Sequence, residues 1–349
     1  MPLLAIISVV LALIVTPLIA RVMKAIGLVD RADSARKIHA GAVPRGGGIA
    51  VVISYIVTLA LSGRTMPAVW SILPAAGLIF AIGILDDVLD LNPWQKLMGQ
   101  TVAAGLACAS GLLNATGASW WMIPVAMIWL LACCNGFNLI DGMDGLAAGA
   151  GIFAAIAIAV SAMLAGNTDL AAAAWPLAGA LAGFLCFNFS PAKIFLGDSG
   201  SLVIGFLLGC FGILGLERPA TPMGLRVPLI ALALPLADAA LTVARRVLSG
   251  RSVFVADRGH VHHRLLERVR NPRKVALLLY GFCGFAAVAS VAASPAGNAV
   301  VSVLLTAALC VGAVAAAWSL RLIAPAQRLD RDQIRPGIIR VISFTRFLL

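Results

Sequence analysis

The sequence predicts an all-α, polytopic integral membrane protein. Of its 349 residues 61% are hydrophobic and 12% are charged, and the mean hydropathy is +1.00, far from the composition of a soluble domain. A hydrocarbon core about 30 Å thick needs roughly 20 apolar residues per helix. About eleven such runs are present, near 2–20, 48–63, 67–85, 97–113, 120–136, 146–165, 170–188, 201–216, 226–243, 275–293 and 298–319.

The first run predicts an uncleaved membrane helix. It has no basic residue in front of it and Arg21 directly behind it, which favours a span with the N-terminus outside. The seven cysteines lie in or at the edge of apolar runs, so neither a disulfide framework nor a CxxC zinc site is expected.

One transmembrane domain over residues 1–349 is expected. The longest polar stretch, 244–274, is too short to bury a core of its own, so it is predicted as a basic, histidine-containing cytoplasmic loop with helical parts. The ninth run contains Pro228 and Pro235, which should bend it. A cytoplasmic tail follows at 320–349.

The basic residues predict the orientation. Of the 26 Lys and Arg residues, all but Arg64, Arg218 and Arg226 fall in one set of alternate loops. The positive-inside rule places that set, and the C-terminus, in the cytoplasm. The net charge of +11 is then explained by topology and by anionic lipid in the bilayer, and no nucleic-acid partner is expected.

Four polar clusters fall in loops on this cytoplasmic side. They contain Asp86 to Asp90, Asn135 to Asp144, Asp198, and the histidines from 260 to 263. An ion-coupled transporter should carry its essential acids near the middle of the membrane, on broken helices. Acids at the ends of spans favour an active site that faces the cytoplasm.

The first cluster is acidic. A helical turn after the third span would bring Asp90 onto the side of Asp86 or Asp87. Three close carboxylates repel one another unless a cation neutralises them, and Mg²⁺ prefers oxygen ligands. The alternative is a solvated acidic loop.

The second cluster, Asn135-Gly-Phe-Asn138-Leu-Ile-Asp141-Gly-Met-Asp144-Gly145, has nearly helical spacing. Its glycines favour a loop or a broken helix. Asn138, Asp141 and Asp144 could hydrogen-bond a base or a sugar, or reach a metal. A calcium loop fits poorly because the downstream glutamate is absent.

Asp198 lies in a Gly-Asp-Ser-Gly-Ser turn, where serine N–H groups could start a helix and face a phosphate. The alternative is an ordinary N-cap in which Asp198 or Ser199 opens the eighth span. His260, His262 and His263 have no fourth zinc ligand of the usual spacing. Their neighbours Arg258 and Arg264 favour an anionic ligand, although structural histidines remain an alternative.

The first cytoplasmic loop carries Lys37, His39 and Arg45 before three glycines. Basic residues and glycines just before a span could hold a phosphate at the headgroup level. Simple positive-inside anchoring is the alternative.

In combination these motifs resemble the polyprenyl-phosphate N-acetylhexosamine-1-phosphate transferases. The resemblance extends over nearly the whole chain and is carried in order by RKxH…PRGGG, DDxxD, NxxNxxDGxDGLA, KIFLGDSGS and HxHHRLL. It implies a multi-pass enzyme of the bacterial inner membrane that transfers a sugar-1-phosphate from a UDP-N-acetylhexosamine to undecaprenyl phosphate and releases UMP. It also implies Mg²⁺ as the cofactor, which Mn²⁺ could replace, and leaves a homodimer open.

The resemblance assigns roles residue by residue. Asp198 is implied as the foremost Mg²⁺ ligand and catalytic group, with Asp86 and Asp87 either orienting or deprotonating the lipid phosphate or sharing the metal. Asp141 is a further metal candidate. The implied substrate-binding residues are Lys37, His39, Arg45, Asp90, Asn135, Asn138, Asp141, Asp144, Phe195, Arg258, His260, His262 and His263. Among them Phe195 would stack on uracil unless it is a plain core residue.

The acidic residue Asp90 and the stretch from Asp238 to His263 are similar to the N-acetylglucosamine-1-phosphate branch. The muramyl-pentapeptide branch usually has lysine at the position of Asp90. The expected product is the lipid-linked sugar that initiates a cell-envelope glycan; the muramyl-pentapeptide reaction and an ion-coupled transporter are the alternatives.

Overall fold

The computed structural model describes residues 1–30, 42–113, 120–216, 226–248, 250, 259–294 and 298–320. The predicted all-α class is confirmed, since helices make up nearly all of this part of the chain. Within it the strands are two-residue segments, β1 (Val29–Asp30) and β2 (Val43–Pro44), which pair antiparallel.

Every predicted apolar run lies on one or two helices. The helices are α1 (Pro2–Ala25), α2 (Gly47–Leu61), α3 (Pro67–Leu89), α4 (Pro93–Ala107), α5 (Ile123–Ile140), α6 (Leu146–Leu164), α7 (Thr168–Asn188), α8 (Asp198–Leu214), α9 (Arg226–Ala231), α10 (Ala233–Leu248), α11 (Val261–Val269), α12 (Pro272–Ala292) and α13 (Ala299–Ser319). A π-helical turn, Cys108–Leu112, extends α4, and a 3₁₀ turn, Trp120–Met122, precedes α5.

Seven helical segments in the described residues are long and apolar enough to cross a membrane, and α2 and α8 are shorter apolar helices. The protein is therefore a multi-pass membrane protein. The count of eleven spans stays a prediction, as does the side on which each terminus lies.

The ninth run is two helices instead of one bent span. Helices α9 and α10 meet at Leu232, between Pro228 and Pro235. Proline has no N–H to donate and its ring clashes with the preceding turn, so two prolines this close interrupt the helix. Beyond α10, the predicted loop 244–274 contains α11, which agrees with the expected helical parts.

The interior is built from small residues on central helices. The apolar windows of α6 and α7 are each 72% buried, against 17% for α1 and 11% for α13, so the outer helices offer their side chains to lipid. Two glycines let α8 approach its neighbours. A Cβ on Gly48 would lie 2.2 Å from Gly200 N, and one on Gly83 would lie 2.4 Å from Ser199 Cα.

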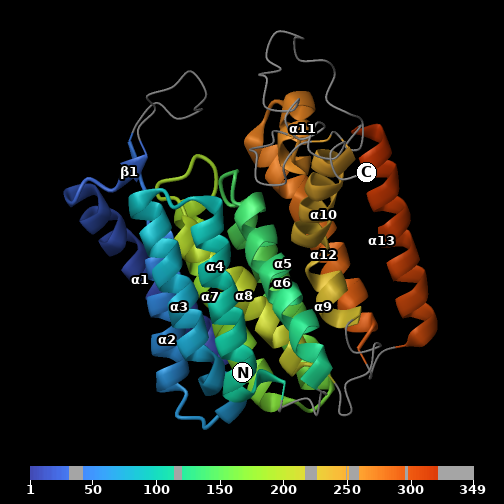
Figure 1. Cartoon of the computed structure of the whole chain (residues 1–349), viewed down its shortest axis with the longest axis horizontal. Helices are drawn as coiled ribbons and strands as arrows, with labels where there is room; N and C mark the ends of the chain where they lie inside the picture. The colour runs from blue at the N-terminus through green and yellow to red at the C-terminus, as the bar shows by residue number, and fades with distance from the viewer. Residues whose placement is uncertain are drawn as a thin grey trace, which may run out of the picture.

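These contacts bring the start of α8 against α2 and α3. Figure 1 shows α10 and α11 at the same end of the bundle as β1. We call this end the polar end, because the side-chain contacts described next join the ends of α3 and α5 to the starts of α4 and α8 there.

Candidate active site

Lys96 joins two carboxylates at the polar end. Its Nζ lies 2.5 Å from Asp86 Oδ2 at the end of α3 and 2.5 Å from Asp198 Oδ2 at the start of α8. The lysine stands in the first turn of α4, which a capping box of Asn92 and Gln95 begins. A cation in a first turn opposes the helix dipole, and the two carboxylates from other helices offset that cost. The sequence places Lys96 only among the basic loop residues and does not reveal these contacts.

Asp87 caps the start of α8. Its Oδ1 accepts the N–H of Asp198 at 2.8 Å and its Oδ2 accepts the N–H of Ser199 at 3.1 Å. The helix follows Gly197, which has no side chain to cap it and a φ of 77°. A negative charge at this end is favoured by the helix dipole. The N-cap expected from Asp198 or Ser199 thus comes from another helix, and it places the Asp198 side chain.

Asn138, at the end of α5, completes the contacts of Asp198. Its Nδ2 donates to Asp198 Oδ1 at 2.7 Å and to Ser201 Oγ at 3.1 Å. Both oxygens of Asp198 therefore have partners, one from α4 and one from α5. The DDxxD, NxxNxxDG and GDSGS motifs, which lie far apart in the sequence, converge on this carboxylate.

Asp90 lies elsewhere than expected. Helix α3 ends at Leu89, and Asp90 adopts the left-handed conformation with a φ of 49° and is exposed to solvent. It therefore does not continue the helical face of Asp86 and Asp87. Asn135, another predicted substrate-binding residue, donates from Nδ2 to Gln100 Oε1 at 2.7 Å and to Leu131 O at 2.8 Å. The first hydrogen bond joins α5 to α4, and the second lies within α5.

The link between α5 and α6 is a loop, as its glycines predicted. Gly145 has a φ of 76° and directly precedes α6. Two residues that the sequence analysis missed hold it: Asn188 Oδ1 accepts the N–H of Gly145 at 3.1 Å, and Tyr280 Oη donates to its carbonyl at 2.7 Å. Asp144 accepts the N–H of Ala192 at 3.0 Å, so this carboxylate orders the segment after α7.

Asp141 begins the same loop and is partly buried. Burial, followed by the charges of Asp198, Asp87 and Asp144, raises the pKa of this carboxyl well above its ordinary value. A cationic group near the loop would relieve that repulsion.

The histidine helix α11 packs over this loop. A Cβ on Gly142 would lie 2.8 Å from His262 Nε2, so the imidazole rests on the glycine backbone. The ring centroids of His262 and His263 are 4.3 Å apart. Burial and the charge of His263 lower the pKa of His262 to about 3. His262 is therefore neutral at physiological pH.

The first loop also reaches the site. Beyond β2, the N–H groups of Gly47 and Gly48 donate to the carbonyls of Phe195 and Leu196, and the N–H of Phe195 donates to the carbonyl of Pro44. Arg45 pairs with Asp30 at 3.4 Å. Phe195, which is hydrogen-bonded to this loop, is partly exposed. Lys37, His39 and Arg258 lie outside the described residues.

Some of the carboxylates at the polar end suit Mg²⁺ better than others. Among the described residues no three His, Cys, Asp or Glu side chains form a metal site by themselves. Protein-bound Mg²⁺ usually has one or two carboxylate ligands, several waters and substrate phosphates. Asp86 and Asp198 fit that pattern, since their oxygens meet at one cation, Lys96 Nζ. Asp87 fits less well because both its oxygens already accept backbone N–H groups.

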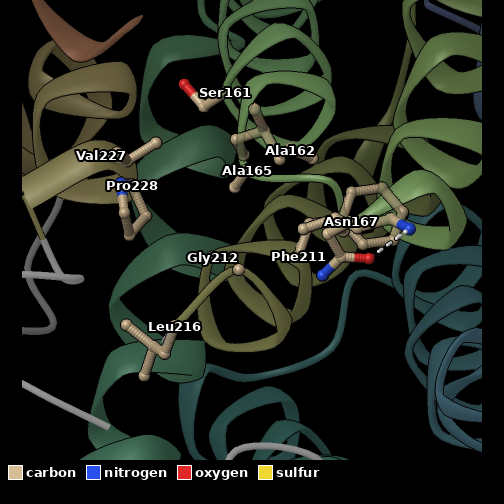
Figure 2. A pocket seen from close by; sticks show the side chains of 12 residues that line it. Ser161, Ala162, Ala165, Asn167, Phe211, Gly212, Leu216, Val227 and Pro228 are labelled. Atoms are coloured by element: carbon tan, nitrogen blue, oxygen red, sulfur yellow. Dashed lines mark hydrogen bonds between the residues drawn. The ribbon is translucent and has the colours of Figure 1, made fainter. Parts of the chain in front are cut away.

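A small cavity of ≈ 140 Å³ lies at the opposite end of the bundle, between the ends of α6 and α8 and the starts of α7 and α9. In Figure 2, Val227 and Pro228 lie on one side of it and Phe211 and Asn167 on the other. None of the expected site residues lines it.

Comparison with known proteins gives consistent matches. Residues 69–216 match the model of glycosyl transferase family 4. A probable undecaprenyl-phosphate N-acetylglucosaminyl 1-phosphate transferase of Bacillus subtilis is 33% identical over 79% of this chain and 80% of its own length. A decaprenyl-phosphate N-acetylglucosaminephosphotransferase of Mycobacterium tuberculosis is 31% identical over 87% and 83%. An undecaprenyl-phosphate alpha-N-acetylglucosaminyl 1-phosphate transferase of Escherichia coli is 28% identical over 74% of each chain.

Proposed function

Because the chain belongs to glycosyl transferase family 4, we propose that it transfers N-acetylglucosamine-1-phosphate from UDP-N-acetylglucosamine to undecaprenyl phosphate. The names of the relatives support the sugar and the polyprenyl phosphate acceptor. The observation that carries the proposal is the convergence of three helices on Asp198 at the polar end, where a lipid phosphate and a soluble donor can meet.

The reaction requires little acid or base chemistry. An oxygen of the lipid phosphate attacks the β-phosphorus of the UDP-sugar, the bond from that phosphorus to the bridging oxygen breaks, and UMP leaves with the bridging oxygen. With a second pKa of about 6, the lipid phosphate is largely a dianion at neutral pH. Catalysis then depends mainly on positioning and on neutralising charge.

The polar end supplies both. Lys96 places a positive charge beside Asp86 and Asp198, and Asn138 orients Asp198. We assign the Mg²⁺ site to Asp198 and Asp86, where a bound Mg²⁺ or Mn²⁺ would neutralise the pyrophosphate and make UMP a better leaving group. Asp87 would act by holding α8 in place.

The remaining residues would bind the two substrates. Asn138, Asp141 and Asp144 border the place proposed for the nucleotide, with Phe195 available to stack on uracil. Lys37 and Arg45 would bind phosphate. Arg258 and the three histidines would face the diphosphate or the sugar. The distribution of Lys and Arg supports a site facing the cytoplasm from the bacterial inner membrane.

The test incubates the purified protein in nanodiscs with undecaprenyl phosphate, Mg²⁺ and a panel of UDP-sugars that includes the muramyl pentapeptide donor. We expect UMP release with UDP-N-acetylglucosamine and strict dependence on both lipid and metal. Release with the muramyl donor alone would replace the proposed sugar. Flux across vesicles without UMP release would favour a transporter.

Asp198→Asn should abolish UMP release and Mg²⁺-dependent donor binding, because the substitution removes the charge that holds the metal. The control is Asp169→Asn, which changes a half-exposed carboxylate that pairs with Arg64 at the opposite end and should leave turnover unchanged. Full activity in Asp198→Asn would overturn the metal assignment.

A further inference from the structure

A buried carboxylate on α10 has no role in the chemistry described above. Asp238 is 1% exposed. Its Oδ2 lies 2.8 Å from His260 Nδ1, and its Oδ1 accepts the N–H of Val261 at 2.8 Å. One side chain therefore holds both the first histidine of the HxHH motif and the first residue of α11.

Asp238 and a neighbouring hydroxyl together determine which ring nitrogen of His260 carries the proton, and Asp238 is the nearer of the two. Thr242 Oγ1 lies 3.3 Å from His260 Nδ1, but its own hydrogen is donated to Asp238 O at 2.7 Å. Thr242 can therefore only accept from the ring, and an ionised Asp238 can also only accept. Both groups that face Nδ1 require a proton on it. Nε2 is then the one nitrogen through which His260 can bind a substrate or exchange a proton with it.

The residues around Asp238 and His260 are closely packed. Arg245, which is 8% exposed, donates to Thr242 Oγ1 at 3.1 Å. A Cβ on Gly259 would lie 2.7 Å from Arg245 Nε, so the residue before His260 rests on the guanidinium. Because Asp238, Thr242 and Arg245 all lie on α10, this helix sets the position and the tautomer of His260.

The position of His260 matters for the rest of the motif. The rings of His260 and His262 are nearly parallel, with an angle of 10° and centroids 5.6 Å apart, and His262 rests on Gly142 beside Asp141. A shift of His260 would therefore move the histidines relative to the loop that carries Asp141.

We propose that Asp238 is a positioning residue that keeps the proton of His260 on Nδ1, so that His260 acts on the sugar-diphosphate donor through Nε2. The assignment rests on the proposed function for the identity of the donor. The tautomer itself does not, and it is measured separately. Histidines that bind a metal through one ring nitrogen often have the other nitrogen held by a carboxylate in the same way.

The first experiment records ¹⁵N spectra of the histidine-labelled full-length protein in nanodiscs at pH 8.5, without substrate. The chain has 4 histidines, and His260→Gln identifies the signal of His260. We expect the Nδ1-protonated tautomer in the unsubstituted protein, and a proton on Nε2 in Asp238→Asn. An Nε2-protonated His260 in the unsubstituted protein would overturn the proposal, even if the protein proves to use another donor.

The second experiment is kinetic. Asp238→Asn keeps an oxygen for the N–H of Val261 but presents an amide to His260, so a purely structural role would survive it. We expect a loss of turnover on the order of 10²-fold. Because Asp238 acts through His260, the Asp238→Asn, His260→Gln double variant should be no slower than His260→Gln alone.

Losses that multiply in the double variant would mean that Asp238 acts independently of His260, which contradicts the proposal. Asp169→Asn serves again as the control. If Asp238→Asn does not fold, the spectrum of the unsubstituted protein still decides the tautomer. An active transferase with His260 protonated on Nε2 would contradict the role of Asp238 alone. A protein with the expected tautomer but no transferase activity would contradict the proposed function alone.

Discussion

Lys96 and Asp87 give the carboxylates of this site two different environments. Lys96 pairs with both Asp86 and Asp198, whereas Asp87 is held by two backbone N–H groups at the start of α8. Asp86 and Asp87, which are adjacent in the sequence, therefore make different kinds of contact. Sequence patterns predicted an acidic cluster. Adjacent residues on a helix point in different directions, but the sequence does not tell that Asp86 faces a lysine and Asp87 the start of another helix.

Lys96→Met should lower UMP release on the order of 10²-fold or more, because Asp86 and Asp198 would be left close together without their cation. UMP release in nanodiscs is the measurement. Lys24→Met is the control, since Lys24 is an exposed lysine on α1. Unchanged turnover in Lys96→Met would show that the site does not depend on this charge.

His262 should make the docking of α11 sensitive to acid. Its folded pKa of about 3 lies below the ordinary value of about 6.5, so the undocked helix binds more protons between these two values. The stabilisation is complete above pH 6.5 and is lost as pH falls toward 3. At pH 5 the loss is about 2 kcal/mol for this residue.

Hydrogen exchange of the α11 amides, corrected for the intrinsic pH effect and compared with the amides of α6, measures this loss. The pH dependence should shrink in His262→Gln, which cannot take up a proton. Equal protection of α11 at pH 7.5 and pH 5 would contradict a neutral, buried His262.

Helix boundaries were predicted well where hydropathy changes abruptly and poorly where packing decides. Glycine correctly marked the loop after α5, whereas the two prolines predicted a bend in the ninth run and the structure has two separate helices there. The end of α3 was missed, because Asp90 in a left-handed conformation is a C-cap that the spacing of the aspartates does not reveal. The sequence likewise did not reveal that Asn135 links α5 to α4, while its role in substrate binding stays a prediction.

Gly83→Ala should separate α3 from α8. The added Cβ would lie 2.4 Å from Ser199 Cα and 2.6 Å from its N, and backbone atoms cannot move aside without moving the helix. We expect a destabilisation of about 1–3 kcal/mol, seen as a lower melting temperature, and a loss of UMP release as Asp198 shifts.

Gly77→Ala is the matched control, because Gly77 lies on the same helix and a Cβ there meets no atom within 4 Å. Its melting temperature should be unchanged or slightly higher, since alanine restricts the unfolded chain. Equal behaviour of the two variants would mean that close packing at the start of α8 does not position the site.

At the scale of the molecule, all the described parts of the site lie at one end of the bundle, and the Arg64–Asp169 pair and the small cavity lie at the other. Positive-inside counting assigns the polar end to the cytoplasm. A one-sided site is also what a donor that is soluble and an acceptor that is anchored in lipid would require.

Cysteine labelling tests that assignment. In a background with Cys186 and Cys310, the exposed cysteines among the described residues, changed to alanine, Thr65→Cys in the turn after α2 should react with a membrane-impermeant maleimide in intact cells. Glu267→Cys on α11 should react only after lysis. Both positions are exposed to solvent. The reverse pattern would invert the orientation and place the site outside.

The sequence by itself determined the membrane class, the positions of the apolar helices and the motifs that identify the family, because hydropathy, charge and motif spacing are properties of neighbouring residues. Tertiary structure alone decided that Lys96 pairs with both Asp86 and Asp198, that Asp87 caps α8, and that Asp238 holds His260. These contacts join residues on different helices. Which side chains meet depends on how closely the glycine-containing faces of α2 and α3 pack against α8. No local sequence pattern encodes the distance between these helices.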